Sequence, residues 1–380
     1  MRDAERRAWE VVKRAYEERT PARAARRPGR RLVLALVVVL GALAAAVLSP
    51  PGRAVFHRVR EAVGIQQAEP ALFSLPAPGR LLVVSAEHGG VWLVHDNGLK
   101  RRLGAYDDAQ WSPHGRFVIA TRGDELIALD VDHGVRWSLA RRGAVWPRWE
   151  GTRVDTRIAY LTPKGLRVVA GDGTGDHLLD RYAADVPAAW DPARLHTVAY
   201  FTGGAIVLRE ADSRRLVWRA PIRVTPSALE WSSDGRYLAV TAQHRVIVFD
   251  AGGHLRRTVS SLGSELIDVA FRPRTHRLAV SVRLQRRSEV RLVDIDHAVR
   301  ARLLFAGPGI FGDIAWSPDG GTLLVAWPTA DQWLFLHGAR VRAVANIKEQ
   351  FPRADHQGPL LELAGRWCCS SLGSRDAVGR

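Results

Sequence analysis

The feature that most constrains the fold of this chain is a repeat of about forty residues, in which each copy opens on an aromatic residue and a tight turn. The clearest copies read WSPHGRFVIA from Trp111, WSSDGRYLAV from Trp231 and WSPDGGTLLV from Trp316. The aromatic residues that open the copies are Phe73, Trp111, Trp149, Trp190, Trp231, Phe271 and Trp316. A steady period of this length indicates a repeat architecture, in which neighbouring copies bury one another's apolar faces.

Each part of the repeat has a local physical cause. In Ser-Pro-Asp-Gly, Pro fixes φ at the second position of a type I turn and Gly suits the fourth. A run of Val, Leu, Ile and Ala follows, as a strand buried on both faces requires. A third strand ends at an acidic residue, as at Asp130 and Asp250, and a fourth strand is rich in Arg, as in LRRTV from Leu255. Arg suits an outer edge strand, because its charge discourages pairing with other sheets.

Four short antiparallel strands in every forty residues make one blade of a β-propeller. Seven aromatic anchors therefore predict an all-β fold with seven blades over residues 70–351, with six or eight blades as alternatives. The recurring Trp is placed to pack between blades, so Trp231 and Trp316 are predicted to be buried there. With four contiguous strands in every blade, no strand is expected to be exchanged between the two ends of the ring.

The Trp-Ser-Pro-Asp-Gly turn and the strand after it resemble the TolB-like, WD-like propeller repeat, although the Gly-His and Trp-Asp signatures of eukaryotic WD repeats are missing. The chain as a whole resembles membrane-anchored propellers of actinobacterial type. This resemblance implies a protein-binding or scaffolding role at the cell envelope. Residues Ala128–Trp137 and Glu210–Trp218 resemble the tryptophan-docking motif of quinoprotein propellers. That second resemblance implies that Trp137 and Trp218 dock blades, and no quinone cofactor follows from it.

The sequence before the repeats predicts a membrane anchor. Residues 32–48 read LVLALVVVLGALAAAVL, and at about 1.5 Å per residue they suffice for a short transmembrane helix. Six Arg and no acid in residues 19–31 predict a cytoplasmic N-terminus and an extracytoplasmic ring. The long charged leader and the Pro-Pro pair at 50–51 favour this uncleaved signal-anchor over two alternatives. These are a signal peptide cleaved near residues 44–46 and a buried core helix.

The segments on both sides of the anchor are also predicted to be helical. In residues 1–31, Trp9, Val12 and Tyr16 form one apolar stripe, on a segment with eleven bases and five acids. Such a helix is either solvated, with its Arg tail against anionic lipid headgroups, or a docking site for a cytoplasmic partner. Residues 49–69 are expected to form a juxtamembrane stalk.

The net charge of +16 comes almost entirely from Arg, since the chain has only four Lys. The charge is spread over all blades and no nucleic-acid-binding motif accompanies it, so nucleic acid is not an expected partner. The expected contacts are an unidentified protein partner, the lipid bilayer through residues 32–48, and anionic polymers of the envelope.

No motif predicts catalytic, cofactor-binding or metal-ligating residues. Gly307–Gly312 matches G-x-G-x-x-G but precedes a strand, so it is expected to be a loop between blades. Asp172–Asp176 is expected to be the turn between the third and fourth strands of its blade, with calcium binding as the alternative. Two pairs of carboxylates are expected to lie in solvated turns rather than to perform acid–base catalysis: Asp130 with Asp132, and Asp294 with Asp296.

The last segment, residues 352–380, fits no repeat. Its apolar side chains are predicted to pack against the first blade and to help hold the ring shut: Leu360, Leu361, Leu363 and Trp367. Cys368 and Cys369 are adjacent, so their Cα atoms lie about 3.8 Å apart, below the usual range for a disulfide. Two unbonded, partly buried thiols are expected there, with a vicinal disulfide as the alternative.

These features predict a non-catalytic binding or scaffolding module at the cell envelope. A first alternative is transmembrane signalling. A short cytoplasmic helix, one span and an outer sensor resemble the layout of membrane anti-sigma factors, although their zinc-type cytoplasmic motif is missing. A second alternative is an envelope enzyme acting in the propeller channel.

Overall fold

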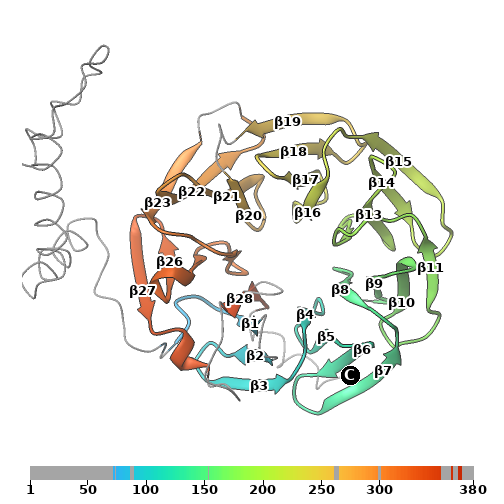
Figure 1. Ribbon diagram of the computed structural model, residues 1–380, viewed down its shortest axis with the longest axis horizontal. Helices are drawn as coiled ribbons and strands as arrows, with labels where there is room; N and C mark the ends of the chain where they lie inside the picture. The colour runs from blue at the N-terminus through green and yellow to red at the C-terminus, as the bar shows by residue number, and fades with distance from the viewer. Residues whose placement is uncertain are drawn as a thin grey trace, which may run out of the picture. The chain divides into compact units, whose positions relative to one another are not determined.

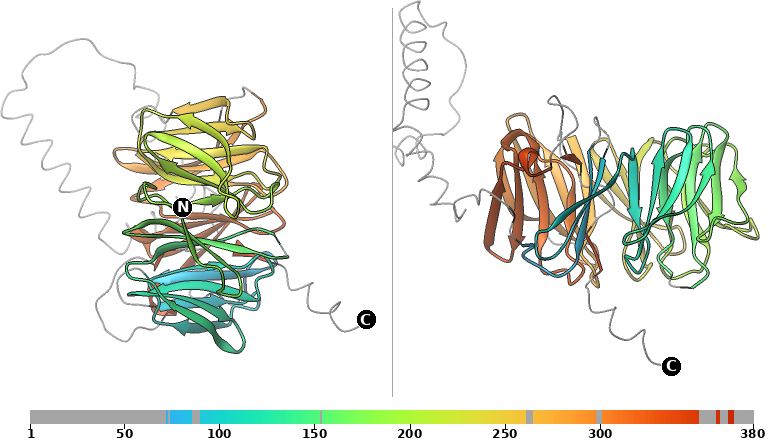
Figure 2. Two further views of the ribbon diagram at one scale, coloured as in Figure 1. Left: turned by 90° about the vertical axis from the view of Figure 1, so that its right-hand side faces the viewer. Right: turned by 90° about the horizontal axis from the view of Figure 1, so that it is seen from below.

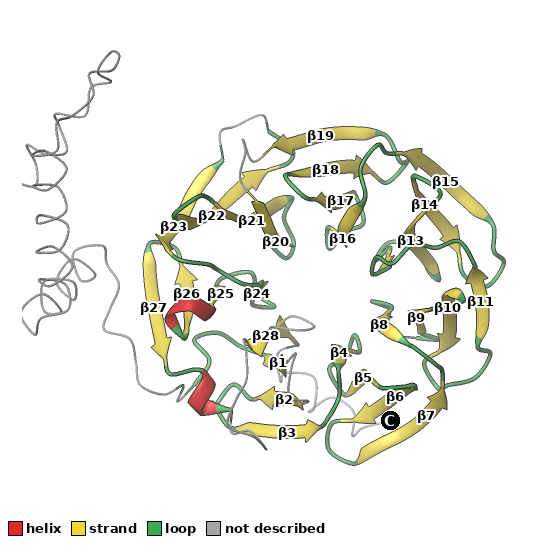
Figure 3. Ribbon diagram, in the orientation of Figure 1, coloured by secondary structure: helices red, strands yellow, loops and turns green. Residues whose placement is uncertain are grey.

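The computed structural model describes residues 72, 74–85, 90–152, 154–260, 265–297, 301–351, 361–362 and 367–369. The predicted leader, transmembrane helix and stalk, residues 1–69, lie outside these ranges. Within them, no helix is long and apolar enough to cross a membrane. The helical elements in this part of the chain are two short 3₁₀ turns, η1 (Pro328–Ala330) and η2 (Lys348–Gln350), drawn in red in Figure 3.

Seven antiparallel sheets stand around a central axis, which makes the described chain an all-β propeller (Figure 1). Seen from the side, the strands run across the thickness of the ring (Figure 2). The predicted number of seven blades is confirmed. We number the blades 1 to 7 in chain order and call the strands of each blade first to fourth, from the axis outward.

Blades 2 to 7 each consist of four consecutive strands. They are, for blade 2, β4 (Asp108–Trp111), β5 (Phe117–Arg122), β6 (Glu125–Asp130) and β7 (Gly134–Ala140); for blade 3, β8 (Val145–Trp149), β9 (Arg157–Thr162), β10 (Gly165–Ala170) and β11 (His177–Asp180); for blade 4, β12 (Ala189–Trp190), β13 (Thr197–Thr202), β14 (Ala205–Glu210) and β15 (Leu216–Pro221). For blade 5 they are β16 (Pro226–Trp231), β17 (Tyr237–Ala242), β18 (Arg245–Asp250) and β19 (Leu255–Ser260); for blade 6, β20 (Glu265–Phe271), β21 (Arg277–Arg283), β22 (Arg287–Asp294) and β23 (Arg302–Pro308); for blade 7, β24 (Ile314–Trp316), β25 (Leu323–Trp327), β26 (Gln332–His337) and β27 (Arg340–Ala345).

The turn after each clear anchor forms as its sequence predicts. In blade 5 the N–H of Gly235 donates to the carbonyl of Ser232 at 2.9 Å, and Gly235 has a φ of 70°. The buried Ser232 hydroxyl then accepts the N–H of Tyr237 at 3.0 Å. Because this hydroxyl satisfies a backbone donor where the second strand begins, Ser follows Trp in the repeat for a structural reason.

The anchor aromatic residue ends the first strand of blades 2 to 7, and in blades 4, 5 and 7 its indole bonds to the blade before it. The indole Nε1–H of Trp190 donates to the Arg148 carbonyl at 2.8 Å, and that of Trp231 donates to the Ala189 carbonyl at 3.2 Å. Trp316 makes the equivalent bond to Ala270 at 3.1 Å. Each of these bonds crosses from one blade to its predecessor, so the anchor fixes two neighbouring blades in register.

The burial predicted for the two reference anchors is confirmed for one of them. Trp231 is 8% exposed and lies in the apolar cluster between blades 4 and 5. Trp316 is only partly buried at the edge of the cluster between blades 6 and 7, so its predicted full burial is wrong. The guanidinium carbon of Arg272 lies 5.4 Å from the centre of the Trp316 ring, so a charged group covers part of the ring that apolar neighbours leave open.

The fourth strands carry a second set of contacts between blades. Trp137 in β7 donates its indole N–H to the Gly171 carbonyl of blade 3 at 3.0 Å, and Trp218 in β15 donates to the Ala251 carbonyl of blade 5 at 3.1 Å. The role implied for these two Trp, docking one blade on the next, is therefore confirmed. Arg257 in β19 makes the corresponding bond to the Asp294 carbonyl of blade 6 at 2.5 Å. The Arg-rich outer strands thus bind neighbouring blades in addition to carrying edge charge.

Apolar packing completes each interface. One cluster of buried side chains lies between every pair of neighbouring blades, including the pair formed by blades 7 and 1. The second and third strands supply most of these side chains and are buried on both faces, as their continuous apolar runs predict. A blade that lost one neighbour would expose one of these faces, so the ring is stable only when it is closed.

The C-terminal tail closes the ring by completing blade 1. Blade 1 takes only β1 (Arg80–Ser85), β2 (Gly90–Val94) and β3 (Lys100–Gly104) from the start of the repeats. Its innermost positions come from the tail, where β28 (Leu361–Glu362) and β29 (Trp367–Cys368) both pair antiparallel with β1. Trp367 is buried, and its ring centre lies 5.9 Å from that of Phe335 in blade 7. The predicted packing of the tail against blade 1 is confirmed for Trp367, and Leu361 pairs with Ser85 of β1 through its backbone. Leu360 and Leu363 lie outside the described residues.

Two details of the predicted closure are wrong. The strands of blade 1 are not contiguous in the sequence, because the C-terminal strands β28 and β29 join β1, β2 and β3 in one sheet. Trp367 occupies the anchor position of this blade. The segment 74–79 contains no strand, so the repeat copy that opens at Phe73 does not supply a first strand; Phe73 itself lies outside the described residues. A disulfide joins Cys368 and Cys369, whose Cα atoms are 3.7 Å apart, so the expected free thiols are also wrong.

We predict that Trp231→Ala lowers the free energy of unfolding by about 3–5 kcal/mol, because it removes a buried side chain and leaves a cavity. Trp316→Ala should cost clearly less, because that ring is only partly buried. Chemical denaturation of both variants measures the difference. Equal losses for the two variants would mean that anchor burial does not set the strength of a blade interface.

We predict that deleting residues 357–380 lowers the melting temperature and speeds proteolysis near blade 1, because β1 loses its inner partners and Leu81 loses Trp367. Deleting only residues 371–380 is the matched control, since it leaves β28 and β29 in place. Thermal melts and limited proteolysis compare the two. If both truncations melt like the full chain, the tail does not contribute to closure.

Candidate binding site

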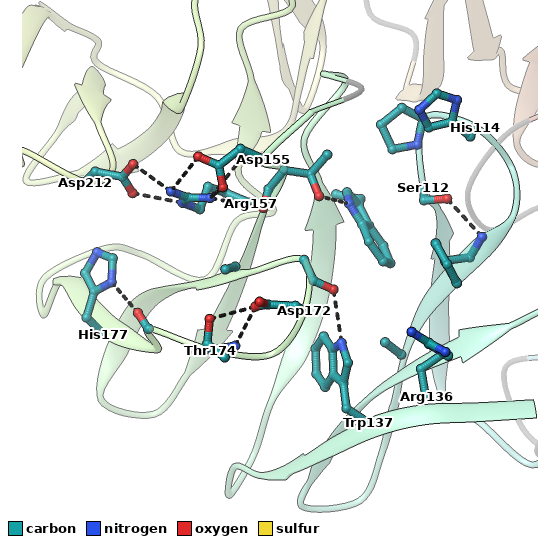
Figure 4. Close-up of a pocket in the computed structure, with 18 residues that line it drawn as sticks. Ser112, His114, Arg136, Trp137, Asp155, Arg157, Asp172, Thr174, His177 and Asp212 are labelled. Atoms are coloured by element: carbon teal, nitrogen blue, oxygen red, sulfur yellow. Dashed lines mark hydrogen bonds and ion pairs between the residues drawn. The ribbon is translucent and has the colours of Figure 1, made fainter. Parts of the chain in front are cut away.

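A cavity with a volume of about 810 Å³ opens between blades 2 and 3 of the ring. Its lining comes from the turns after the first strands and from the turns after the third strands, which lie on one face of the ring (Figure 4). Cavities of this size hold small organic ligands in proteins. No sequence motif marked this position, because its lining residues come from three blades.

One wall of the cavity is aromatic. Phe117 in β5 stacks on Trp149 at the end of β8, with ring centres 6.2 Å apart and planes 13° from parallel. Trp137 stands on the same side, held by its bond to the Gly171 carbonyl. Its ring packs on Gly173, where φ is 89° and a Cβ atom would come within 3.0 Å of the indole. The docking residue Trp137 and the anchor residue Trp149 therefore also form a fixed apolar surface in the cavity.

The opposite wall is ionic. Arg157, at the start of β9, donates from Nε to Asp212 Oδ1 and from Nη2 to Asp212 Oδ2, both at 3.0 Å. Its Nη1 donates to Asp155 Oδ1 at 2.6 Å. The hydrogen bond from Arg157 lowers the pKa of Asp155. For Asp212, burial acts to raise the pKa, but the hydrogen bonds from Arg157 outweigh burial and the pKa is lowered. One cation is thus shared by two carboxylates that stay charged at neutral pH.

A buried carboxylate supports this wall from behind. Glu150 directly follows the anchor of blade 3 and is fully buried. Its Oε1 accepts the backbone N–H of His196 in blade 4 at 2.6 Å, and its Oε2 accepts the N–H of Arg157 at 3.0 Å. The His196 ring lies 2.6 Å from Asp212 through Nδ1. Burial raises the pKa of Glu150. The ionic wall is therefore tied into the junction of blades 3 and 4.

The lower edge of the cavity contains the segment Asp172–Asp176. It is the turn between β10 and β11, as predicted. Asp172 accepts the Thr174 N–H at 3.0 Å and the Thr174 hydroxyl at 2.7 Å, both on Oδ1. Asp176 instead forms ion pairs with Arg141 and Arg167. Because the two carboxylates serve different partners, the geometry does not favour the calcium alternative. In the described part of the chain no three His, Cys, Asp or Glu side chains are grouped to hold a metal.

The first carboxylate pair, Asp130 with Asp132, is not fully solvated as the sequence predicted. Asp130 is buried and accepts bonds from the Asp132 N–H at 3.0 Å and from Arg116 at 3.2 Å. Burial raises its pKa, but these bonds and one with His133 outweigh burial and lower the pKa to about 2. Only Asp132 is exposed as expected. The pair therefore stabilises its own turn.

In the second pair, Asp294 accepts the N–H groups of Asp296 and His297 in its own turn. Asp296 instead takes part in a set of contacts between blades 5 and 6, which we call the latch: Asp234, Tyr237, His276 and Asp296. The His276 ring lies between two carboxylates, with Nε2 2.8 Å from Asp234 of blade 5 and Nδ1 2.5 Å from Asp296 of blade 6. The Tyr237 hydroxyl donates to Asp296 at 2.7 Å. Since both ring nitrogens face carboxylates, both donate and the ring is an imidazolium. Sequence reasoning missed His276 and His196; their shared signal is that each directly precedes the second strand of its blade.

The central channel forms a second cavity, of about 550 Å³. Its carboxylates already accept bonds from backbone groups of the inner strands. Asp268 accepts the Ile314 N–H of blade 7 at 2.9 Å, and Glu230 accepts the Phe271 N–H of blade 6 at 3.0 Å. Burial raises the pKa of Asp108, whose Oδ1 accepts the Ala109 N–H at 2.7 Å. These acids hold first strands together, which gives the channel a structural use for them. Gly307–Gly312 spans the end of β23 and the connection to blade 7, as expected.

These observations place the protein in the class of seven-bladed β-propellers with a preformed cavity between two blades. No family model and no curated protein matches the chain. Among solved structures it is similar to a chain of the mitotic checkpoint complex, with 15% identity, a TM-score of 0.52, and coverage of 74% of this chain and 96% of that one.

Two further solved structures are similar. The propeller domain of Cps50 (Swd1) from Myceliophteria thermophila has 13% identity and a TM-score of 0.50, over 62% of this chain and 83% of that one. Hydrazine synthase from Kuenenia stuttgartiensis has 15% identity and a TM-score of 0.50, over 61% and 76%. At these identities the similarity establishes the fold alone, and the names include both an enzyme and members of assemblies.

We predict that the latch makes stability depend on pH. Burial disfavours the charged His276 ring, but its hydrogen bonds to Asp234 and Asp296 outweigh burial and raise its pKa above the ordinary value of about 6.5. The stabilisation is therefore complete below about pH 6.5 and is lost as pH rises through the raised pKa. The carboxylates, whose pKa values are lowered, remain charged until well into the acid range.

Thermal melts of the wild type and of His276→Gln across the pH range measure this effect. The variant should melt lower than the wild type at about pH 5–6, and the gap should narrow as pH rises above neutral. A gap that stays constant with pH would contradict a charged latch.

Proposed function

We propose that this chain is a single-pass membrane protein whose propeller lies outside the cytoplasm and serves as a non-catalytic binding or scaffolding module at the cell envelope. The observation that carries the binding role is the cavity between blades 2 and 3, which is formed by residues already fixed by contacts between blades. A preformed hollow of this kind loses little conformational entropy when a ligand or partner occupies it.

The chemistry of the two cavities supports binding over catalysis. In the central channel, Asp268 and Glu230 accept bonds from neighbouring first strands. In the larger cavity, Arg157 is divided between Asp155 and Asp212. The similarity to a propeller chain of the mitotic checkpoint complex agrees with a protein partner.

The sequence supports the membrane anchor. Residues 32–48 carry no charge, and the Arg cluster at 19–31 precedes them. By the positive-inside rule this arrangement keeps the N-terminus in the cytoplasm and exports the ring. In that location the ring would meet the polyanions of the envelope, and its excess of Arg would favour such contacts.

Transmembrane signalling is a second candidate function, favoured by one observation. The stripe of Trp9, Val12 and Tyr16 gives the basic leader an apolar face that a cytoplasmic protein would cover. Affinity capture with residues 1–31 as bait, compared with a Trp9→Asp and Tyr16→Asp bait, tests this candidate. A specific partner that the altered bait loses would favour signalling over a purely extracytoplasmic role.

We predict the topology from the Arg cluster. An alkaline phosphatase reporter fused after Arg380 should be active, because that enzyme folds only outside the cytoplasm, and the same reporter fused before Met1 should be inactive. A cytoplasmic reporter should give the reverse pattern. Active phosphatase at the N-terminus with inactive phosphatase at the C-terminus would overturn the proposed location.

A further inference from the structure

We propose that the cavity between blades 2 and 3 binds an organic cation that carries a quaternary ammonium group. The inference deepens the binding role proposed above and rests on it. It is carried by the juxtaposition of three aromatic rings with an excess of carboxylates in one cavity of about 810 Å³ (Figure 4). Aromatic faces attract cations through the ring quadrupole, and quaternary ammonium groups are bound by aromatic residues in this way.

The aromatic wall already attracts a cation of the protein itself. The guanidinium carbons of Arg116 and Arg136 lie 5.1 Å and 6.0 Å from the centre of the Phe117 ring, and Arg116 is paired with Asp130. Arg136 is exposed, lines the cavity, and forms no ion pair within the described ranges. An arginine with no carboxylate partner stands against this ring, so the wall offers a favourable place for positive charge. We infer that Arg136 occupies the wall in place of the ligand and moves aside when the ligand binds.

The charge of the lining favours a cation over an anion. Three carboxylates, of Asp155, Asp172 and Asp212, face the cavity against two guanidinium groups. Hydrogen bonds from Thr174 lower the pKa of Asp172, so this carboxylate is charged at neutral pH. The whole chain carries +16, so an acidic hollow is contrary to its general charge. Local carboxylates in a recess act at short range and with less screening than surface charge.

The bonding of those carboxylates distinguishes between kinds of cation. Both oxygens of Asp212 accept bonds from Arg157, and Asp155 accepts a third. An ammonium or guanidinium group that gives up its water needs new acceptors for its N–H groups, and most acceptors in this cavity are already used. A quaternary ammonium group donates no hydrogen bond. It needs only aromatic faces and a negative field, and the cavity supplies both.

Choline binding to the full-length protein in detergent tests the proposal, followed by the fluorescence of the tryptophans in the wall. The neutral carbon isostere of choline, dimethylbutanol, has the same shape without the charge and should bind at least tenfold more weakly. Phe117→Leu keeps the site apolar but removes a ring face, and should weaken choline binding about tenfold. Asp172→Asn should weaken it severalfold.

Arg136 gives the sharpest prediction. Arg136→Ala should strengthen choline binding severalfold, because it removes an unpaired like charge from the aromatic wall, whereas the charge of Arg116 is offset by Asp130. Arg256→Ala is the matched control: Arg256 is exposed, and it precedes the docking residue Arg257 of β19 as Arg136 precedes Trp137 of β7. That variant removes the same charge from blade 5 and should leave binding unchanged.

Vesicles of phosphatidylcholine, compared with free choline, distinguish a lipid headgroup from a free small molecule as the source of the cation; binding of either supports the proposal. Equal binding of choline and its neutral isostere would overturn it. So would binding of acetate or inorganic phosphate that Arg136→Ala abolishes, since the site would then be an anion site. Either result, with reporters that still place the ring outside, would leave the proposed function standing.

Discussion

The ring depends on hydrogen bonds that pass from the anchor position of one blade to the blade before it. The carbonyl groups of the inner strands lie in interfaces without water, where an unpaired polar group costs about 1–3 kcal/mol. The indoles of Trp190, Trp231 and Trp316 satisfy such carbonyls and fill the same interface with apolar surface. A tryptophan serves both needs at once in blades 4, 5 and 7, whereas the indole N–H of Trp111 has no hydrogen-bond partner among the described residues and that residue contributes through its burial.

In blades 3 and 6, where no indole serves this purpose, the blade before supplies the acceptor. Phe271 has no side-chain N–H, and its backbone N–H instead donates to Glu230 of blade 5. The Trp149 indole donates within its own blade to Thr156, and its backbone N–H donates to Gln110 of blade 2 at 2.5 Å. The same interface is therefore bonded in two ways. The second way places a buried polar side chain near the channel, which gives Glu230 a structural role there.

The closure of the ring also shapes the cavity between blades 2 and 3. The turn that follows Trp111 forms part of the lining through Ser112 and His114. The same turn is held from blade 1, where Arg80 donates to the Gly115 carbonyl at 2.5 Å and the Cys369 Sγ lies 3.5 Å from the Pro113 carbonyl. The tail that completes blade 1 thus contacts the backbone of one cavity wall. Stability of the ring and the geometry of the binding site are for this reason coupled.

The sequence predicted what depends on local periodicity and missed what depends on distant pairing. The anchors from Trp111 to Trp316, the turns after them and the docking roles of Trp137 and Trp218 each follow from a short pattern. The exchanged strands around Leu361 and Trp367 are too short to show a period, and their partner β1 lies far away in the sequence. The cavity could not be predicted from the sequence, because Phe117, Asp172 and Asp212 lie in three different blades and come together only when the ring closes.

Native-state hydrogen exchange of the full chain tests most directly whether one closed ring holds these parts together. If the tail is an integral part of blade 1, the one amide of the pair Trp367 and Cys368 that faces β1 should exchange as slowly as those of Leu82 and Val84 in β1, in one cooperative unit. Fast exchange of this amide beside slow exchange in β1 would contradict a ring closed by strand pairing, and with it the support that closure gives to the cavity wall.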